Sequence, residues 1–233
     1  MLVTPYLGQW YQRLPKVVRK IVFKSIKLLD KPGRYFRTQA DVTIPRQPLS
    51  QRHVENCQLT LDRATMLSRL PKGGVAAELG VDQGNFSETL LRILQPATLH
   101  LVDLWGSDRY SDDEMNAVAE RFSTEIAEDR VRLLRQYSLE AAAQFPDDHF
   151  QFVYIDTDHS YFSTAKELAA WAPKIAQGGV LAGHDYVLGN WKKANRYGVI
   201  EAVHEFCVKE NWELVFMTID PIENQSFAIR KLG

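Results

Sequence analysis

The sequence has few cysteines, no long apolar run and no large net charge. Cys57 and Cys207 are too few and too far apart for a disulfide framework or a cysteine metal site, so a reducing cytoplasm is the expected setting. No run approaches the roughly eighteen apolar residues of a membrane span, and the N-terminus lacks the pattern of a signal peptide. A net charge of −1 gives no reason to expect a nucleic-acid partner.

The charge that is present is unevenly distributed. Residues 1–50 contain ten Lys or Arg against two Asp, a net charge of +8, which leaves −9 for residues 51–233. The same fifty residues hold five of the ten prolines. We therefore expect a basic, proline-containing N-terminal extension over residues 1–54 and one globular domain over residues 55–233, a length that suits a single substantial core.

The extension contains one clear periodic segment. Apolar residues recur at helical spacing between Pro15 and Pro32, and lysines line another face, which predicts a basic amphipathic helix at about 16–30 followed by an irregular connection. Its apolar side is expected to pack on the main domain or on a second subunit, and a homo-oligomer is therefore predicted. Docking on an anionic membrane surface or an acidic partner is the alternative.

From about residue 57 the pattern alternates between helices and strands, which favours a parallel sheet covered by helices on both faces. A helix is expected at 59–70. Strands are expected at 75–81, 99–104, 130–137, 150–155 and 179–183, with helices between them. Two further strands at 213–219 and 226–231 are joined by a segment too short for a parallel crossover, so the sequence should end in an antiparallel hairpin.

The first of these strands leads into a glycine-containing turn. Gly80 and Gly84 follow it within the segment from Glu78 to Ser87, where glycine lets the backbone adopt positive φ and approach a ligand closely. The helix start that follows offers free N–H donors. Asp103 comes about twenty residues later at the end of the next strand, where a carboxylate can accept both hydroxyls of a ribose.

Polar residues also follow two later strands of the predicted sheet. One strand is followed by Asp156, Asp158 and His159, and the next by His184 and Asp185. The carboxyl ends of parallel strands share one edge, where open α/β sheets bind ligands, so these groups should lie close together. Several neighbouring carboxylates repel one another, and a divalent cation would relieve that repulsion.

The alternating pattern with its final hairpin resembles the class I S-adenosylmethionine-dependent methyltransferases over roughly residues 55–233. The resemblance implies a Rossmann-like, seven-stranded, mostly parallel sheet of strand order 3-2-1-4-5-7-6. It also implies that the turn wraps the methionine and ribose of the cofactor, that Asp103 holds the ribose, that Ser138 borders the adenine and that Trp105 stacks on it. The implied cofactor-binding residues are Glu78, Gly80, Gly84, Asp103, Trp105, Ser138 and Asp156.

These implied roles have structural alternatives. Asp103 could instead be a helix N-cap or a solvent-facing loop residue. Ser138 could cap the following helix, and Trp105 could belong to the core.

The two polar clusters resemble those of the macrolide-sugar O-methyltransferases and the cephalosporin-hydroxylase-like proteins, and more distantly the catechol-type O-methyltransferases. The resemblance implies a magnesium ion held by Asp156, His184 and Asp185, and His159 as general base. Because His184 replaces a carboxylate here, manganese, iron, zinc or no metal is favoured over magnesium. His159 could alternatively make a structural hydrogen bond that orders its turn.

The sequence thus predicts a cytoplasmic methyltransferase that moves a methyl group from S-adenosylmethionine to a hydroxyl of a small molecule. His159 would accept the acceptor's proton, and Asp156, also assigned a catalytic role, would help to fix the metal or the substrate. The loops at 106–114, with Asp108, and at 187–197, with Trp191, Lys192 and Lys193, could complete the site.

Four alternatives remain at this stage. They are a metal-independent methyltransferase acting on another small molecule, a nicotinamide-dependent oxidoreductase, a metal-dependent oxygenase, and a protein that binds S-adenosylmethionine or its product without catalysis. The sequence does not identify the methyl acceptor.

Overall fold

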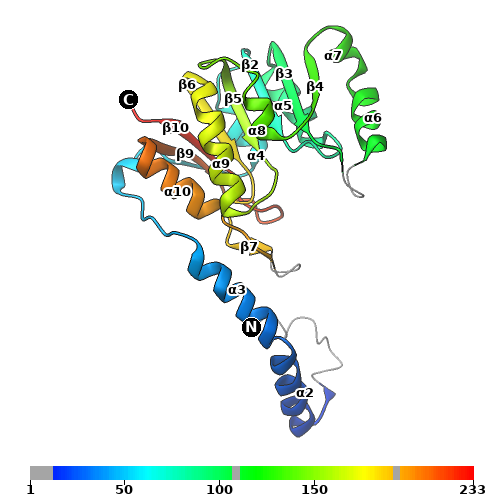
Figure 1. Cartoon of the computed structure of the whole chain (residues 1–233), viewed down its shortest axis with the longest axis vertical. Coiled ribbons are helices and arrows are strands. Elements are labelled where there is room, and N and C mark those ends of the chain that lie inside the picture. Colours follow the sequence, from blue (N-terminus) through cyan, green and yellow to red (C-terminus); the bar gives the residue numbers. More distant parts are fainter. Residues whose placement is uncertain (1–12, 107–110, 191–194) are drawn as a thin grey trace. The chain divides into compact units, whose positions relative to one another are not determined.

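The structure is a computed structural model that describes residues 13–106, 111–190 and 195–233 (Figure 1). The chain divides into two compact units. The first joins the residues up to Pro45 with Gly189–Arg196, and the second comprises Arg46–Leu188 and Tyr197–Gly233. The expected boundary between the extension and the domain, at residues 54 and 55, stays a prediction.

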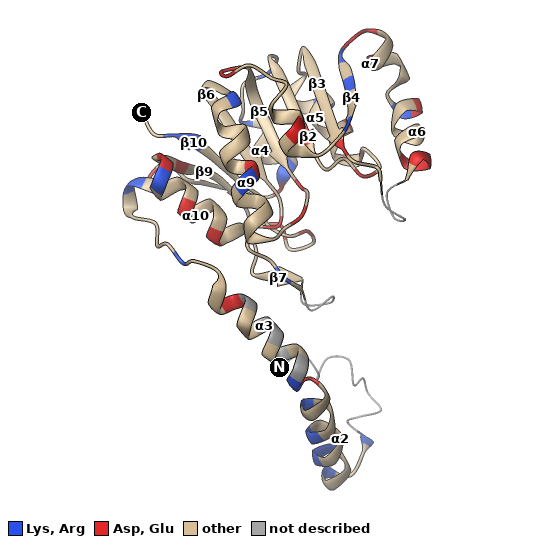
Figure 2. Ribbon diagram, in the orientation of Figure 1, with Lys and Arg blue, Asp and Glu red and all other residues tan. Residues whose placement is uncertain are grey.

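The first unit contains two helices and a short hairpin. Helix α2 (Lys16–Leu29) confirms the predicted basic helix, and Figure 2 shows its Lys and Arg positions in blue along the ribbon. The irregular connection expected after it is wrong, because α3 (Lys31–Thr43) follows at once. Pro32 lies in the first turn of α3, where a missing N–H removes no helical hydrogen bond. Strands β7 (Gly189–Asn190) and β8 (Asn195–Arg196) form the hairpin, and Arg196 Nε lies 2.9 Å from Asp41 Oδ1 of α3.

The second unit is built on one sheet of the predicted kind, with strand order β1-β9-β10-β6-β5-β2-β3-β4. The seven predicted strands are β2 (Val75–Leu79), β3 (Thr98–Asp103), β4 (Val131–Arg135), β5 (Phe150–Ile155), β6 (Ile175–Gly183), β9 (Trp212–Thr218) and β10 (Phe227–Lys231). The first five are parallel, and β10 runs antiparallel to both β6 and β9. The Rossmann-like α/β fold, the predicted order and the C-terminal hairpin are therefore confirmed.

An additional strand lies at the edge of this sheet. Residues 59–70, expected to form one helix, contain β1 (Gln58–Thr60) and then α4 (Arg63–Ser68). Strand β1 pairs in parallel with β9, and Asp62 caps the helix by accepting a hydrogen bond from the backbone N–H of Thr65 at 2.6 Å. The cap fixes the helix start after Asp62, so Leu59 belongs to the strand and not to the helical stripe.

Helices cover both faces of the sheet (Figure 1). They are α5 (Asn85–Leu94), α6 (Asp112–Arg121), α7 (Ser123–Ala127), α8 (Ser138–Ala142), α9 (Tyr161–Trp171) and α10 (Val199–Glu210), with short 3₁₀ turns at Gln51–His53 and Ala172–Lys174. Alternate strand residues enter two separate cores: Val153 packs in the core with Trp171 of α9, and Tyr154 in the core with Leu90 of α5. Among the described helices, none has the length and apolar character needed to cross a membrane.

Candidate active site

The predicted glycine turn joins β2 to α5, and its two glycines are required by the protein's own packing. Both have positive φ, +86° at Gly80 and +75° at Gly84. A Cβ atom on Gly80 would lie 2.0 Å from the backbone oxygen of Asp156, and one on Gly84 would lie 2.8 Å from the ring of Phe122. The backbone N–H of Gly80 also donates to the carbonyl of Val102 on β3. The turn therefore packs tightly against the ends of the two neighbouring strands.

Asp103 ends β3 beside this turn and helps to build it. Its Oδ2 accepts hydrogen bonds from the backbone N–H groups of Val81 at 2.7 Å and Asp82 at 3.1 Å, and its Oδ1 accepts one from Trp105 at 3.2 Å. A carboxylate has about four acceptor positions, so Oδ1 keeps one for a ligand hydroxyl. Asp103 lies where the sequence places it, and it also holds the turn in shape.

Trp105 and Ser138 are bound within the protein. Trp105 has no exposed surface, and its ring N–H lies 3.3 Å from the carbonyl oxygen of Asp82. Ser138 donates its hydroxyl to Glu167 of α9, and its carbonyl accepts the ring N–H of Trp171 at 3.2 Å. This geometry favours the core role for Trp105. Ser138 is the first residue of α8, not its cap. Their adenine contacts stay predictions.

Glu78 is a buried acid on β2 just before the turn. Only 2% of its surface is exposed, and its carboxylate accepts the hydroxyl hydrogen bond of Ser87. Burial raises the pKa of Glu78 to about 8; the charges of Asp156 and Asp103 act in the same direction, and the Ser87 hydrogen bond and the charge of Arg63 oppose them. This carboxyl group is therefore largely protonated near neutral pH.

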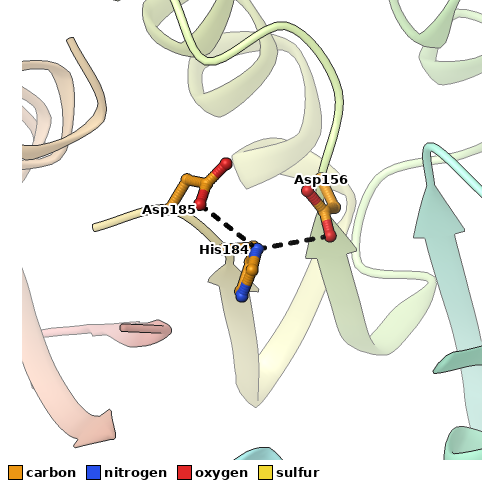
Figure 3. Close-up of side chains that lie close together, drawn as sticks. All are labelled: Asp156, His184 and Asp185. Atoms are coloured by element: carbon orange, nitrogen blue, oxygen red, sulfur yellow. Dashed lines mark ion pairs between the residues drawn. The ribbon is translucent and has the colours of Figure 1, made fainter. Parts of the chain in front are cut away.

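The predicted cluster of Asp156, His184 and Asp185 forms at the ends of β5 and β6 (Figure 3). His184 Nδ1 lies 3.6 Å from Asp156 Oδ2 and 3.5 Å from Asp185 Oδ1. One potential ligand atom from each residue lies within 4.8 Å of the other two, a spacing that a divalent cation could bridge with small side-chain movements. Burial raises the pKa of Asp156, against the charges of His184 and His159.

The surroundings of His184 meet only part of what a metal ligand needs. A ligating imidazole usually donates its other ring N–H to an acceptor. Nε2 of His184 is buried and has no hydrogen-bond partner within the described part of the chain. Two carboxylates and an imidazole thus fit a divalent cation by chemistry and spacing, whereas the outer hydrogen bond is missing.

His159 is paired with Asp185, which puts it beside the cluster. Its Nε2 lies 3.0 Å from Asp185 Oδ2, and its ring lies 4.8 Å from that of Tyr197. Asn224 donates to the other oxygen of Asp185 at 2.6 Å. Burial alone would lower the pKa of His159, but the hydrogen bond and charge of Asp185 outweigh it and raise this pKa. Burial alone would raise the pKa of Asp185, but the hydrogen bonds from His159 and Asn224 lower it overall.

Asp158 lies beside this group and is also bound by the start of α9. Its Oδ1 accepts the backbone N–H of Ser160 at 2.8 Å, and its Oδ2 accepts the hydroxyl of Ser163 at 2.9 Å. These hydrogen bonds tie Asp158 to the start of α9. It also lines one small pocket together with His159 and His184, so all five polar residues predicted at this edge lie near one another.

Three residues near the site were not anticipated from the sequence: Arg63, Glu167 and Asn224. Glu167 is buried and accepts hydrogen bonds from Ser138 and, at 2.7 Å, from Thr157 at the end of β5. Burial raises its pKa. In the helix expected at 59–70, Arg63 falls on the face formed by Leu59, Met66, Leu67 and Leu70. A charged residue among these apolar ones was the sequence signal that could have pointed to Arg63. Asn224 lies in the turn of the hairpin and gave none.

Of the two loops expected to complete the site, parts can be placed. Asp108, Trp191, Lys192 and Lys193 lie outside the described residues. In the first loop, Asp112 begins α6, and its Oδ1 lies 2.6 Å from Arg135 Nη2 of β4.

A large cavity lies elsewhere, at the amino-terminal edge of the sheet. It has a volume of about 1200 Å³ and is lined by the starts of β6 and β9 with parts of α9 and α10. None of the predicted site residues lines it. The acidic and histidine cluster is at the opposite edge, so the two features are separate.

Comparison with known proteins links this geometry to an activity. Residues 77–186, from β2 to just beyond Asp185, match the model of a family described as a methyltransferase domain. No curated protein matches the chain.

Three solved structures are similar to it. A Corynebacterium glutamicum protein has 14% identity and a TM-score of 0.54, over 91% of this chain and 98% of that one. The Bacillus subtilis tRNA methyltransferase TrmK has 13% identity and a TM-score of 0.52, over 75% and 67%. A Streptococcus mutans protein, described among the methyltransferases and in complex with S-adenosylhomocysteine, has 13% identity and a TM-score of 0.52, over 73% and 97%. At these identities the three structures support the fold alone.

The strand order, the hairpin and the turn after β2 define a domain of the class I methyltransferase fold. Over residues 77–186, a little less than half of the chain, this domain is similar to the family described as a methyltransferase domain.

Proposed function

We propose that the protein transfers the methyl group of S-adenosylmethionine to a hydroxyl group of a small molecule, of a sugar, polyketide or phenolic type. The observation that carries this proposal is the pairing of His159 with Asp185 beside Asp156 and His184, next to the turn after β2. Such a group suits removal of a proton from a hydroxyl, which methylation of an oxygen requires.

His159 is the proposed general base. Because Nε2 faces Asp185 at 3.0 Å, Nδ1 is the ring nitrogen that takes the acceptor's proton. The acceptor oxygen forms a bond to the methyl carbon while the bond from that carbon to sulfur breaks, which leaves S-adenosylhomocysteine. Asp185 orients the imidazole and stabilises its protonated form. Much of the rate enhancement would come from holding oxygen, carbon and sulfur in line.

In the same proposal Asp156, His184 and Asp185 hold a divalent cation. Such an ion would lower the pKa of a substrate hydroxyl and fix its position. Because one ligand is an imidazole, we propose manganese, iron or zinc ahead of magnesium. If no metal is bound, the same three side chains would contact the acceptor directly, as in a metal-independent methyltransferase.

The roles of Asp103 and the turn follow from their geometry. The remaining acceptor position on Oδ1 of Asp103 would take a ribose hydroxyl, and both hydroxyls would be held once the ligand replaces the 3.2 Å hydrogen bond from Trp105. The half-buried Asp156, and Glu78 once it ionises, would suit the positively charged sulfonium of the cofactor.

Calorimetric titration with S-adenosylhomocysteine tests the cofactor, before and after chelation and with magnesium or manganese added back. We expect micromolar binding, with a heat that depends on the metal.

The variants His159→Ala and Asp156→Ala should lose turnover, measured as S-adenosylhomocysteine released across a panel of hydroxylated acceptors. Their affinity for S-adenosylhomocysteine should stay near that of the wild type. Absence of binding under every condition would exclude the proposed function.

Two further outcomes separate the alternatives. If either variant keeps most of its activity, the assigned roles of these residues are wrong. Tight cofactor binding without methyl consumption across the whole panel would instead favour a non-catalytic protein that binds S-adenosylmethionine or its product.

A further inference from the structure

Arg63 is the first residue of α4 and lies at the same edge of the sheet as the cluster. Its guanidinium carbon is 4.5 Å from the centroid of the Phe86 ring, at the start of α5. It also forms an ion pair with Glu223 in the hairpin turn. The Arg63 side chain is 20% exposed, so it is largely buried but still reachable from solvent.

The charge of Arg63 acts on the acids of the site. It opposes the pKa increase of both Glu78 on β2 and Asp156 after β5. Because Phe86, which Arg63 contacts, is the second residue of α5, Arg63 lies beside the turn that we assign to the cofactor. A guanidinium over an aromatic ring keeps a planar fork of N–H donors, which can bind a planar anion.

Besides Phe86, Arg63 interacts with two side chains, Tyr154 and Glu223, and the second of them is suited to exchange. The Glu223 side chain is 48% exposed, and ion pairs with such accessible groups add little stability. A carboxylate delivered by a ligand into the less exposed region beside Phe86 would form a stronger, two-pronged pair. Arg63 can thus leave a solvent-exposed partner for a ligand without a large energetic loss.

We propose that Arg63 binds the α-carboxylate of the methionine part of S-adenosylmethionine. This inference rests on the proposed function, since it assumes that the cofactor enters beside Gly80. The amino-acid end of the cofactor carries a carboxylate, an ammonium group and the nearby sulfonium. The acids of the site suit the two cations, and Arg63 supplies the complementary charge for the carboxylate.

A pair of ligands that differ only in this carboxylate tests the inference. S-adenosylhomocysteine and its decarboxylated analogue are titrated by calorimetry into wild type, Arg63→Met and Arg63→Lys. Arg69→Met, an exposed residue at the end of the same helix, is the matched control. We expect Arg63→Met to weaken S-adenosylhomocysteine binding about 10- to 100-fold, as for loss of a charged hydrogen-bonded pair. Binding of the analogue should change by less than about twofold.

The remaining arms distinguish recognition from support of the fold. Arg63→Lys keeps the charge but loses the planar fork, so its loss should be intermediate. Glu223→Gln removes the exposed partner and should leave S-adenosylhomocysteine affinity unchanged or higher. Equal weakening of both ligands by Arg63→Met, or weakening of neither, would overturn the inference. Failure of the wild type to bind either ligand would overturn the proposed function as well.

Discussion

Glu78 gives the sharpest test of the electrostatics at this site. The carboxyl group is 2% exposed, accepts the hydroxyl hydrogen bond of Ser87, and has a pKa raised to about 8 by burial. In the unfolded chain the same group should titrate near its ordinary value of 4.5. Replacing Glu78 with Gln keeps the shape and an acceptor for Ser87, and removes the titration.

The sign of the effect follows from proton binding. Between pH 4.5 and about pH 8 the native state keeps a proton that the unfolded chain has lost, so its free energy of unfolding falls as pH rises. The stabilisation is fully present at acid pH and is lost as pH passes the native pKa. With those two pKa values, wild type should lose about 2 kcal/mol relative to Glu78→Gln between pH 6 and pH 8. Because structural relaxation reduces such penalties, this figure is an upper estimate.

Urea unfolding of both proteins at pH 6, 7 and 8 measures this difference directly. Subtracting the two curves removes contributions common to both, including most of that from the buried Asp156. Glu88→Gln, on the exposed side of α5, controls for the loss of one glutamate. Parallel curves for wild type and Glu78→Gln would mean that Glu78 is already ionised in the native state, and would refute the reasoning.

Three other predictions follow from the same geometry. Gly80→Ala should lower the free energy of unfolding by at least about 2 kcal/mol, measured by urea unfolding, because φ is +86° and the added Cβ would lie 2.0 Å from the backbone oxygen of Asp156. Gly73→Ala is the control for backbone strain alone, since Gly73 has a φ of +83° and an added Cβ would have no neighbour within 4 Å. Under the proposed function, the sulfonium should drive Glu78 to ionise, so near pH 7 S-adenosylmethionine should release more protons on binding than S-adenosylhomocysteine. Calorimetry in buffers of different ionisation enthalpy would detect this release, and equal release would contradict the idea. The double variant Val17→Glu, Ile21→Glu changes the exposed apolar face of α2 and should dissociate the expected homo-oligomer, which light scattering would detect as a lower molar mass. If the molar mass of the variant is unchanged and the wild type binds anionic vesicles, a membrane role for α2 is favoured.

The fold could be predicted because its signals are periodic and local. Strands such as Phe150–Ile155 are apolar along their whole length, as burial on both faces requires, and the short link between the last two strands left only an antiparallel pairing. The errors in the predicted elements lie where a single residue determines the start of a helix. Asp62 shifted a helix start by its cap, and Pro32 began a helix where the sequence suggested an irregular connection. Effects of single residues such as these do not change the periodicity of the sequence.

The sequence predicted where most of the site residues lie in the fold, but not which groups they hydrogen-bond. Parallel strands bring their carboxyl ends together, so the proximity of Asp156 to His184 follows from topology. Topology does not say that Asp158 turns toward α9, nor that Asp103 is already occupied by backbone N–H groups. Those outcomes depend on competition among nearby donors within a few ångströms, and this competition is fixed only when the loops are built.

Arg63 shows that a residue which does not fit a predicted helix can itself be informative. In a stripe otherwise formed by apolar residues, a guanidinium is costly unless something in the folded protein compensates it. Here the compensation comes from Phe86, Glu223 and the hydroxyl of Tyr154 on β5, residues far apart in the sequence. A residue that breaks a local rule and is satisfied by the site around it is a candidate for function. The same reasoning applies to Glu78, an acid in a buried strand beside the cofactor turn, because both residues place an ionisable group where packing alone would favour an apolar one.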